Sequence, residues 1–340
     1  MKKEKIGTIC TLVFVLLAST WAAEKTPLKL AHSTPLPELK DGDFDHFTAD
    51  VAGNRLFSTA EENGKVLIFD LKTSKLIHTI DGLKAPHSML YRADLKKLFV
   101  VDGDLGELKI YETTAYKPVG TVKLREGADS STYDPSTKYL YVAETGKDAH
   151  QPDSYIAIVD TNNAKQVAEI KIDSDDIEAI ALEKSGPRLY IDIRGKNEVQ
   201  VYDRNSHNLL ATWPTAEQAK KPTTIALDEP DHRLFIGTRD PGKFLVMDSE
   251  TGKIVTTLSG PALADDMVYQ RDQKRIYVAG SQFIDVIEQK DPDHYEQIGH
   301  IATAFRAKTA ILVPQLKRYY LAVPHHEKQT AELRVYDVVQ

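Results

Sequence analysis

Short apolar runs recur along the chain at a nearly constant interval. Each run places an aromatic residue between aliphatic ones, as in LFVV at residues 98–101 and LYVA at residues 140–143. Successive aromatic residues are 42, 42, 49, 45, 42 and 43 residues apart. The seven positions are Phe57, Phe99, Tyr141, Tyr190, Phe235, Tyr277 and Tyr320. A period of this length is typical of stacked supersecondary units and fits four-stranded propeller blades.

Each repeat divides into four short runs that alternate as strands do. A first apolar run precedes each aromatic anchor, and polar turn residues such as those at 134–138 separate the two. The third run ends each time in an acid: Asp70, Glu112, Asp160, Asp203, Asp248, Glu288 and Asp337. We predict that these acids accept hydrogen bonds from backbone amides of the turn that follows. A fourth run, such as residues 254–258, completes the first six repeats.

The seventh repeat has no fourth run after its third. Residues 28–33 have the matching pattern and precede the first repeat, so we expect them to pair with residues 333–336. Such pairing closes the ring and removes free sheet edges. The predicted fold class is therefore all-β: a seven-bladed β-propeller of four-stranded antiparallel blades. It is predicted to form one domain over residues 24–340, with the ring closed by the amino-terminal strand.

Two of the repeats resemble a known family. The segments KYLYVA at 138–143 and RIYVA at 275–279, each followed by a strand that ends in an acid, resemble YVTN-type repeats. These occur in seven-bladed propellers of bacterial and archaeal surface-layer and periplasmic proteins. The wider superfamily includes lactonases, streptogramin lyases and quinoprotein-like propellers, and the resemblance covers essentially the whole chain after residue 23. It implies the fold, but that superfamily contains enzymes, electron-transfer subunits and binding scaffolds.

The first 23 residues have the pattern of a secretory signal peptide. Lysines at positions 2, 3 and 5 precede an apolar run over residues 6–18, and small residues follow near the expected cleavage site at 22–23. The apolar run is short for a membrane span. We therefore expect a periplasmic or secreted protein with no stable membrane span after cleavage. An uncleaved amino-terminal anchor is the alternative.

Cysteine content and charge narrow the classes of partner. The only cysteine, Cys10, lies in the predicted signal peptide, which leaves the exported part without a disulfide, a thiolate metal site or a cysteine nucleophile. The chain has a net charge of -7, and loss of residues 2–5, which carry +2, makes it about -9. Nucleic-acid binding is therefore not expected. Small molecules, metal ions or another exported protein are the expected partners.

One face of the predicted propeller collects the irregular loops. The connection into each first strand and the loop between the second and third strands emerge on the same face. The long departures from the repeat, residues 144–154, 214–223 and 324–332, all lie there. The residues just before the first strands are predicted to surround the channel mouth: Asp45, His46, His87, Ser88, Asp129, Ser130, Glu178, Thr223, Thr224, Asp265, Asp266, Lys308 and Thr309. Some of this polarity is expected in any wet channel.

Histidines at this face are the candidate metal ligands. They are His46, His87, His325 and His326, from blades that are neighbours in the closed ring. We predict that these imidazoles converge, with Glu61 and Glu62 adding oxygen atoms. Imidazole with carboxylate suits zinc or iron, and imidazole also binds copper. No local motif requires a cofactor, so a divalent zinc, copper or iron ion is predicted from inferred geometry alone.

Two classes of function remain open. The first is a non-catalytic binding or scaffold protein that holds a small ligand, metal ion or partner protein at the loop-rich face. Its candidate ligand-binding residues are Asp45, Asp129, Glu178, Asp265, Asp266, Arg194 and Arg239.

The second class is implied by the resemblance: a metal-dependent hydrolase or lyase of lactonase type at the channel mouth. Glu178, Asp129 and Asp265 would hold the cation there, and His87 or His326 would serve as a base. The asparagine expected at a lactonase mouth is absent, and no residue is assigned as catalytic. Convergence of three or more of these side chains, His46 included, on one point would favour the enzyme.

Overall fold

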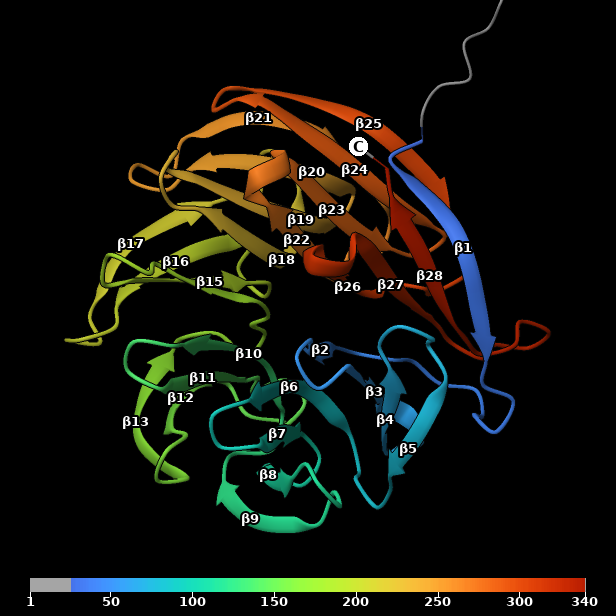
Figure 1. Cartoon of the computed structure of the whole chain (residues 1–340). Coiled ribbons are helices and arrows are strands. Elements are labelled where there is room, and N and C mark those ends of the chain that lie inside the picture. The colour runs from blue at the N-terminus through green and yellow to red at the C-terminus, as the bar shows by residue number, and fades with distance from the viewer. Residues whose placement is uncertain (1–25, 340) are drawn as a thin grey trace, which may run out of the picture.

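The computed structural model describes residues 26–339, which form 28 strands in seven four-stranded sheets around a central channel (Figure 1). The predicted signal peptide lies outside the described residues. These contain no α-helix, only the 3-10 turns η1 (Glu61–Asn63), η2 (Arg271–Gln273) and η3 (Pro314–Leu316). None of these is long and apolar enough to cross a membrane. The predicted seven-bladed all-β propeller is confirmed.

Strands follow one another outward from the channel within each blade. The innermost strands are β2 (Phe47–Asp50), β6 (Pro86–Arg92), β10 (Ala128–Asp134), β14 (Ile180–Leu182), β18 (Lys220–Asp228), β22 (Asp266–Gln270) and β26 (Thr309–Val313). The second strands are β3 (Arg55–Ala60), β7 (Lys97–Asp102), β11 (Tyr139–Glu144), β15 (Arg188–Ile193), β19 (Arg233–Asp240), β23 (Arg275–Gly280) and β27 (Arg318–Val323). The third strands are β4 (Lys65–Asp70), β8 (Glu107–Glu112), β12 (Ser154–Asp160), β16 (Glu198–Asp203), β20 (Gly242–Asp248), β24 (Phe283–Asp291) and β28 (Glu332–Val338). The outermost strands are β5 (Leu76–Ile80), β9 (Pro118–Lys123), β13 (Lys165–Ile172), β17 (Leu209–Pro214), β21 (Ile254–Ser259), β25 (His294–Ala302) and β1 (Leu28–Pro35).

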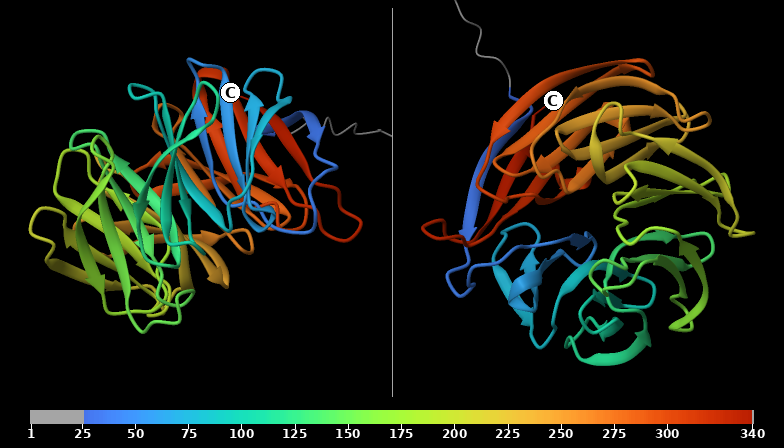
Figure 2. Two further views of the ribbon diagram at one scale, coloured as in Figure 1. Left: turned by 90° about the horizontal axis from the view of Figure 1, so that it is seen from below. Right: turned by 180° about the vertical axis from the view of Figure 1, so that it is seen from behind.

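The amino-terminal strand β1 completes the last blade, as predicted. It pairs antiparallel with β28, with Leu28 opposite Val338 and Leu30 opposite Tyr336. Figure 2 shows β1 in blue beside the red strands of that blade. The innermost strands of neighbouring blades contact one another all the way round, including β26 with β2. The ring is therefore closed by strands from the two ends of the described chain.

The aromatic anchors of the repeat form the core between blades. All seven, at positions 57, 99, 141, 190, 235, 277 and 320, are at most 2% exposed. Several stack on aromatic residues nearby: the rings of Phe235 and Phe244 are 5.7 Å apart, and those of Tyr277 and Tyr319 are 5.6 Å apart. Because side chains of a strand alternate between its two faces, each second strand packs against both neighbouring blades. The aromatic residues therefore recur in the sequence because each blade buries one of them against a neighbouring blade.

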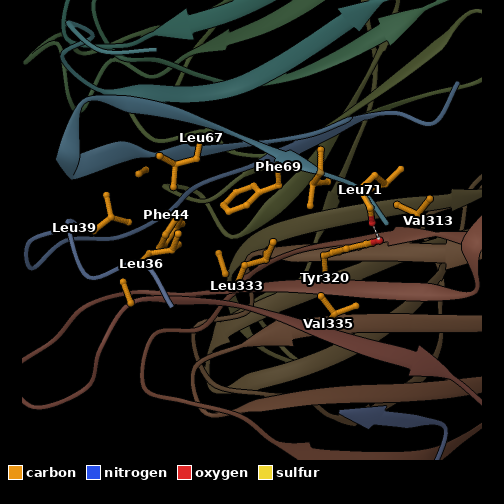
Figure 3. Close-up of a cluster of buried hydrophobic side chains, with 14 residues drawn as sticks. Leu36, Leu39, Phe44, Leu67, Phe69, Leu71, Val313, Tyr320, Leu333 and Val335 are labelled. Carbon is orange, nitrogen blue, oxygen red and sulfur yellow. Dashed lines mark hydrogen bonds between the residues drawn. The ribbon is translucent and has the colours of Figure 1, made fainter. Parts of the chain in front are cut away.

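An apolar cluster fills the junction where the ring closes. Figure 3 shows Phe69 of blade one between Leu67 and the side chains of blade seven, among them Leu333. The Tyr320 hydroxyl donates a hydrogen bond to the Leu71 carbonyl across the junction. The closure is thus held by apolar packing and a buried hydrogen bond, in addition to the β1–β28 ladder.

Acids at the ends of third strands cap the turns that follow, as predicted for most blades. The Asp70 carboxylate accepts hydrogen bonds from the backbone N–H groups of Lys72 at 3.1 Å and Thr73 at 2.8 Å. Equivalent bonds are accepted by Glu112, Asp160, Asp203 and Asp248. The prediction for Glu288 is wrong: β24 continues to Asp291, which accepts the turn amides in that blade, because the outer hairpin is longer there.

Replacement of Asp70 by asparagine is expected to lower the free energy of unfolding by about 1 kcal/mol near neutral pH. The Thr73 amide holds the pKa of the Asp70 carboxyl below its ordinary value of 3.8. The carboxylate therefore stabilises the fold above that value, and this stabilisation is lost as the pH falls through the lower folded pKa. Urea unfolding of both proteins at neutral pH and at a pH near the ordinary pKa measures the effect. The difference in free energy of unfolding between wild type and Asp70→Asn should be smaller at the acid pH. The exposed-turn variant Asp104→Asn is the control, and a gap independent of pH would contradict the assignment.

Candidate functional site

The predicted mouth residues line a cavity of about 180 Å³ at the entry to the first strands. Its lining includes Asp45, His46, Glu61, His87, Asp129, Ser130, Asp148, Glu178, Thr223, Arg239, Asp265 and Lys308. A further cavity of about 200 Å³ in the channel shares His46 and Asp265 with it and adds Ser88, Thr224 and Asp266. The innermost strands that carry these residues surround the centre of the ring in Figure 1. The structure thus brings most of the predicted mouth residues together around these two cavities.

Bulges in the first strands bring several of these side chains to the mouth. Pairing between β6 and β7 shifts between Pro86 and Met89, so β6 accommodates one extra residue at positions 87–88. β10 shifts in the same way at positions 129–130, and β18 at Thr223. A bulge bends a strand and redirects its side chains. These residues were predicted to precede the strands, whereas the structure places them within longer, bulged strands.

Asp45 is the centre of the mouth cluster and is only 7% exposed. His87 donates from Nδ1 to Asp45 Oδ2 at 2.9 Å, and His46 Nε2 lies 3.7 Å from the same oxygen. His87 Nδ1 is also 3.5 Å from Asp129 Oδ1. Two sets of three side chains could each hold a metal ion: Asp45 with His46 and Asp129, and Asp45 with Glu61 and His87. Within each set, the ligand atoms lie within 4.8 Å of one another. Each set is therefore compact enough for its three side chains to reach a single cation.

The acids keep both mouth histidines in their charged form. Burial lowers the pKa of His87, but the Asp129 and Asp45 carboxylates outweigh it and raise this pKa to about 10. Burial also lowers the pKa of His46, but the carboxylates of Asp45 and Asp266 outweigh this effect and raise it. His46 donates a hydrogen bond from Nδ1 to Asp266 at 3.0 Å. In return, despite its burial, the pKa of Asp45 is held well below its usual range by the two imidazolium groups.

For Glu61 and Asp129, the cost of burying a charged carboxylate is not offset by hydrogen bonds from neighbouring groups in the described chain. Burial and the Asp45 charge raise the pKa of Glu61 to about 8, and burial likewise raises the pKa of Asp129. Within residues 26–339 neither carboxyl group receives a hydrogen bond. A cation beside them would relieve the cost of ionising both groups.

Cationic side chains at the mouth are already paired with acids. Lys308 Nζ lies 2.6 Å from Asp265 Oδ2, and Arg239 pairs with the same carboxylate. Arg194 pairs with Glu178, so that an anionic ligand would have to displace an acid from each arginine. Arg194 and Arg239, which were predicted to bind a ligand, are therefore already neutralised by acids and offer little free positive charge to an anion.

The structure corrects the predicted convergence of four histidines. His325 pairs with Asp41 and bridges to the β1–β2 connection, while His326 stacks on Phe305 with ring centres 4.6 Å apart. Both lie on the loop between β27 and β28, which Figure 1 shows at the outer rim beside the end of β1. In the described part of the chain, neither belongs to a donor group with His46 or His87. The loop folds outward because it binds the β1–β2 connection.

The lactonase-type cation set is not assembled either. Glu178 and Asp265 are each held by arginine, and neither joins Asp129 in a donor group of the described residues. Of the side chains proposed to converge in an enzyme, only His46 and Asp129 share one group. The observed sets are instead built on Asp45.

Sequence reasoning missed two acids of the site. Asp148 lines the mouth from the insertion in blade three, and buried Asp43 lies beside the mouth, 3.9 Å from Lys308 Nζ, and pairs with Arg306. The proximity of Asp43 to Asp45 in the sequence was a usable signal. The position of Asp148 depends on the folded shape of the insertion, for which the repeat provides no template.

Comparisons with known proteins identify the fold and no family. No protein-family model and no curated protein match this chain. A chain of the crystal structure of the mitotic checkpoint complex is similar in structure, with a TM-score of 0.74 at 14% identity over 99% of this chain and 100% of that one. The RRP9 WD40 repeats have a TM-score of 0.73 at 11% identity, over 92% and 100%.

At such identities the likeness shows the fold alone. The chain is a seven-bladed β-propeller, and one of these structural neighbours is a WD40-repeat protein. These comparisons do not support the YVTN or lactonase families specifically.

Proposed function

We propose that this protein is an exported, non-catalytic binding propeller that holds a divalent metal ion of the zinc class at its channel mouth. The observation that carries the proposal is the donor set Asp45, Glu61 and His87, whose ligand atoms lie within 4.8 Å of one another. Carboxylates and imidazole are the ligands that zinc takes in proteins together with cysteine. The exported part of this chain has no cysteine, so these are its available strong ligands.

Charge at the mouth supports a cation over an anion. The arginines and Lys308 are paired with acids, whereas Glu61 and Asp129 have no hydrogen-bond donor in the described part of the chain. Metal binding would replace the protons on His87 and Glu61, because ligands must be deprotonated. A bound ion would therefore supply the positive charge that the buried carboxylates of Glu61 and Asp129 lack.

A scaffold role is better supported than catalysis. Of the three acids that would hold a cation in a lactonase-type site, Glu178 and Asp265 each form an ion pair with an arginine instead. One structural neighbour is a chain of the mitotic checkpoint complex, which supports a partner protein for this propeller as well. The signal-peptide pattern of residues 1–23 and the resemblance to YVTN-type repeats support a periplasmic or secreted location.

Calorimetric titration of chelator-treated protein with Zn²⁺, Cu²⁺ and Fe²⁺ tests the metal site. At least one ion is expected to bind once per chain. Glu61→Gln is expected to weaken that binding by at least about tenfold, because it removes a charged ligand. The matched control is Glu62→Gln, on the adjacent and exposed residue of the same turn. Absence of saturable binding, or equal losses in the two variants, would refute the proposed site.

A further inference from the structure

Cationic side chains gather on the short-turn face of the propeller, which lies opposite the channel mouth. This face carries the turns between first and second strands and those between third and fourth strands. The turns η2 of blade six and η3 of blade seven are adjacent there, because Gln273 and Pro314 line one small cavity of about 80 Å³. Figure 1 shows the orange coil of η2 and the red coil of η3 on these neighbouring blades.

The same backbone geometry presents a lysine at the end of both turns. Lys274 and Lys317 follow the two 3-10 turns with φ angles of 50° and 51°, in the left-handed region. The backbone N–H of Lys274 donates to the Arg271 carbonyl at 3.1 Å, and that of Lys317 donates to the Pro314 carbonyl at 3.0 Å. Both lysines are exposed, and neither forms an ion pair with a carboxylate of residues 26–339.

Hydrogen bonds join these turns to the neighbouring blade and to the end of the chain. Arg275 donates from Nη1 to the Val339 carbonyl at 2.6 Å, and Arg318 donates from Nη1 to the Lys72 carbonyl at 2.6 Å. The turns of blades six, seven and one therefore form one continuous surface. We call its cationic residues the turn patch: Lys72, Lys75, Lys274, Arg275, Lys317 and Arg318.

Acids within these turns do not cancel the positive charge of the turn patch. The Asp70 carboxylate caps its own turn, Asp337 lies 3.9 Å from Arg318 Nε, and Asp272 is exposed. Other acids nearby are paired with cations outside the patch: Asp50 with Arg55, Asp228 with Arg271 and Glu288 with Lys290. Six cations against three carboxylates leave an excess of positive charge, although the whole chain carries -7. Such a local excess attracts an anionic surface.

The chain enters the propeller at the edge of the turn patch. The Val339 N–H donates to the carbonyl of Pro27, directly before β1, and the Val338 N–H donates to the Lys317 carbonyl, both at 2.9 Å. The sequence before this point contains lysines at positions 2, 3 and 5 and the apolar run over residues 6–18. The expected cleavage site at 22–23 lies only a few residues before β1. The membrane-directed part of the sequence therefore joins the propeller beside the turn patch.

We propose that the turn patch docks the propeller on an anionic lipid bilayer, with the channel mouth directed away from the membrane. Clusters of about four to eight lysine or arginine residues beside a membrane-directed segment are typical of anionic lipid binding. Each such residue near the surface strengthens binding about fivefold. The patch residues lie on rigid turns of neighbouring blades, so little ordering is needed on contact. This docking does not depend on the metal site, which lies on the other face.

Flotation of the full chain with lipid vesicles tests the proposal, in a chelator that excludes bridging by metal ions. Mixed vesicles of phosphatidylcholine and phosphatidylglycerol are compared with vesicles of phosphatidylcholine alone, which measure any contribution of the apolar run. The mixed vesicles are expected to bind the protein at least about tenfold more tightly at 0.1 M salt. This preference should vanish at 1 M salt, where the screening length falls from about 10 Å to about 3 Å. Equal binding to both vesicles at 0.1 M salt, or a preference that survives 1 M salt, would overturn the proposal.

Paired variants then locate the contact. Lys274→Asn combined with Lys317→Asn should weaken binding to the mixed vesicles by at least about tenfold, because two charges are removed. Asparagine tolerates the left-handed φ of both positions, so the turns are retained. The matched control combines Lys220→Asn with Lys221→Asn on the loop-rich face, where both lysines are exposed and Lys221 has a φ of 56°. It should change binding by less than about twofold.

Two outcomes of these experiments would contradict the turn patch as a membrane contact. One is an equal loss in the two pairs of variants, which would show a response to net charge alone. The other is tighter binding of duplex DNA than of mixed vesicles at the same salt concentration, which would assign the patch to a soluble polyanion.

Discussion

The free energy of unfolding of the chelator-treated protein is expected to fall by several kcal/mol between about pH 6.5 and pH 10 through titration of His87. Burial opposes its charge, but Asp129 and Asp45 raise the folded-state pKa to about 10 from an ordinary value of 6.5. The folded state therefore holds this proton more tightly than the unfolded state. The stabilisation is complete below the unfolded pKa and is lost as the pH rises through the folded one, at about 1.4 kcal/mol for each unit.

Urea unfolding at intervals across this range measures the effect, and His87→Gln should have a distinctly flatter profile. Glu61, with its pKa raised to about 8 by burial and Asp45, contributes in the same direction at lower pH. The Glu61→Gln variant therefore serves to separate the two contributions. If His87→Gln and wild type lose stability in parallel above neutral pH, the charged state assigned to His87 is wrong.

Phe69→Ala is expected to reduce the free energy of unfolding by about 3–5 kcal/mol, the usual cost of removing a buried phenylalanine side chain. Phe69 is 1% exposed and packs in the cluster that joins blade one to blade seven (Figure 3). The cavity would form at the interface between blade one and blade seven, where the ring closes. Thermal and urea unfolding would show the loss as a lower midpoint.

Ile77→Ala is the matched control for this core variant. Ile77 lies on β5 of the same blade and is 53% exposed, so its replacement should cost less than about 1 kcal/mol. Losses of similar size in the two variants would mean that the closure cluster is not packed as the structure shows.

Strand order and burial were predictable because they depend on local pattern. The anchor residues, such as Tyr277, are buried where their period places them. The longest spacing, from Tyr141 to Tyr190, reflects the insertion between the end of β11 at Glu144 and the start of β12 at Ser154. The partner of β1 was also predictable, because a missing fourth run left one vacant edge for it.

Side-chain convergence was only partly predictable. His46 and His87 meet at Asp45 because each precedes or begins an innermost strand, a position that the repeat defines. His325 and His326 have no such position, and their loop binds Asp41 and Phe305 instead. Loop placement depends on contacts between segments that are distant in sequence, which periodicity does not encode.

The sequence alone determined the seven blades, their strand order, the closing strand and the ring of polar residues at the channel mouth. All of these follow from alternation and from a repeated unit that must bury both of its faces. The tertiary structure decided which acids share a cation-sized space and which arginines neutralise the others. Those outcomes depend on bulges, an insertion and packing between blades, where displacements of a few ångströms determine whether two charged groups meet.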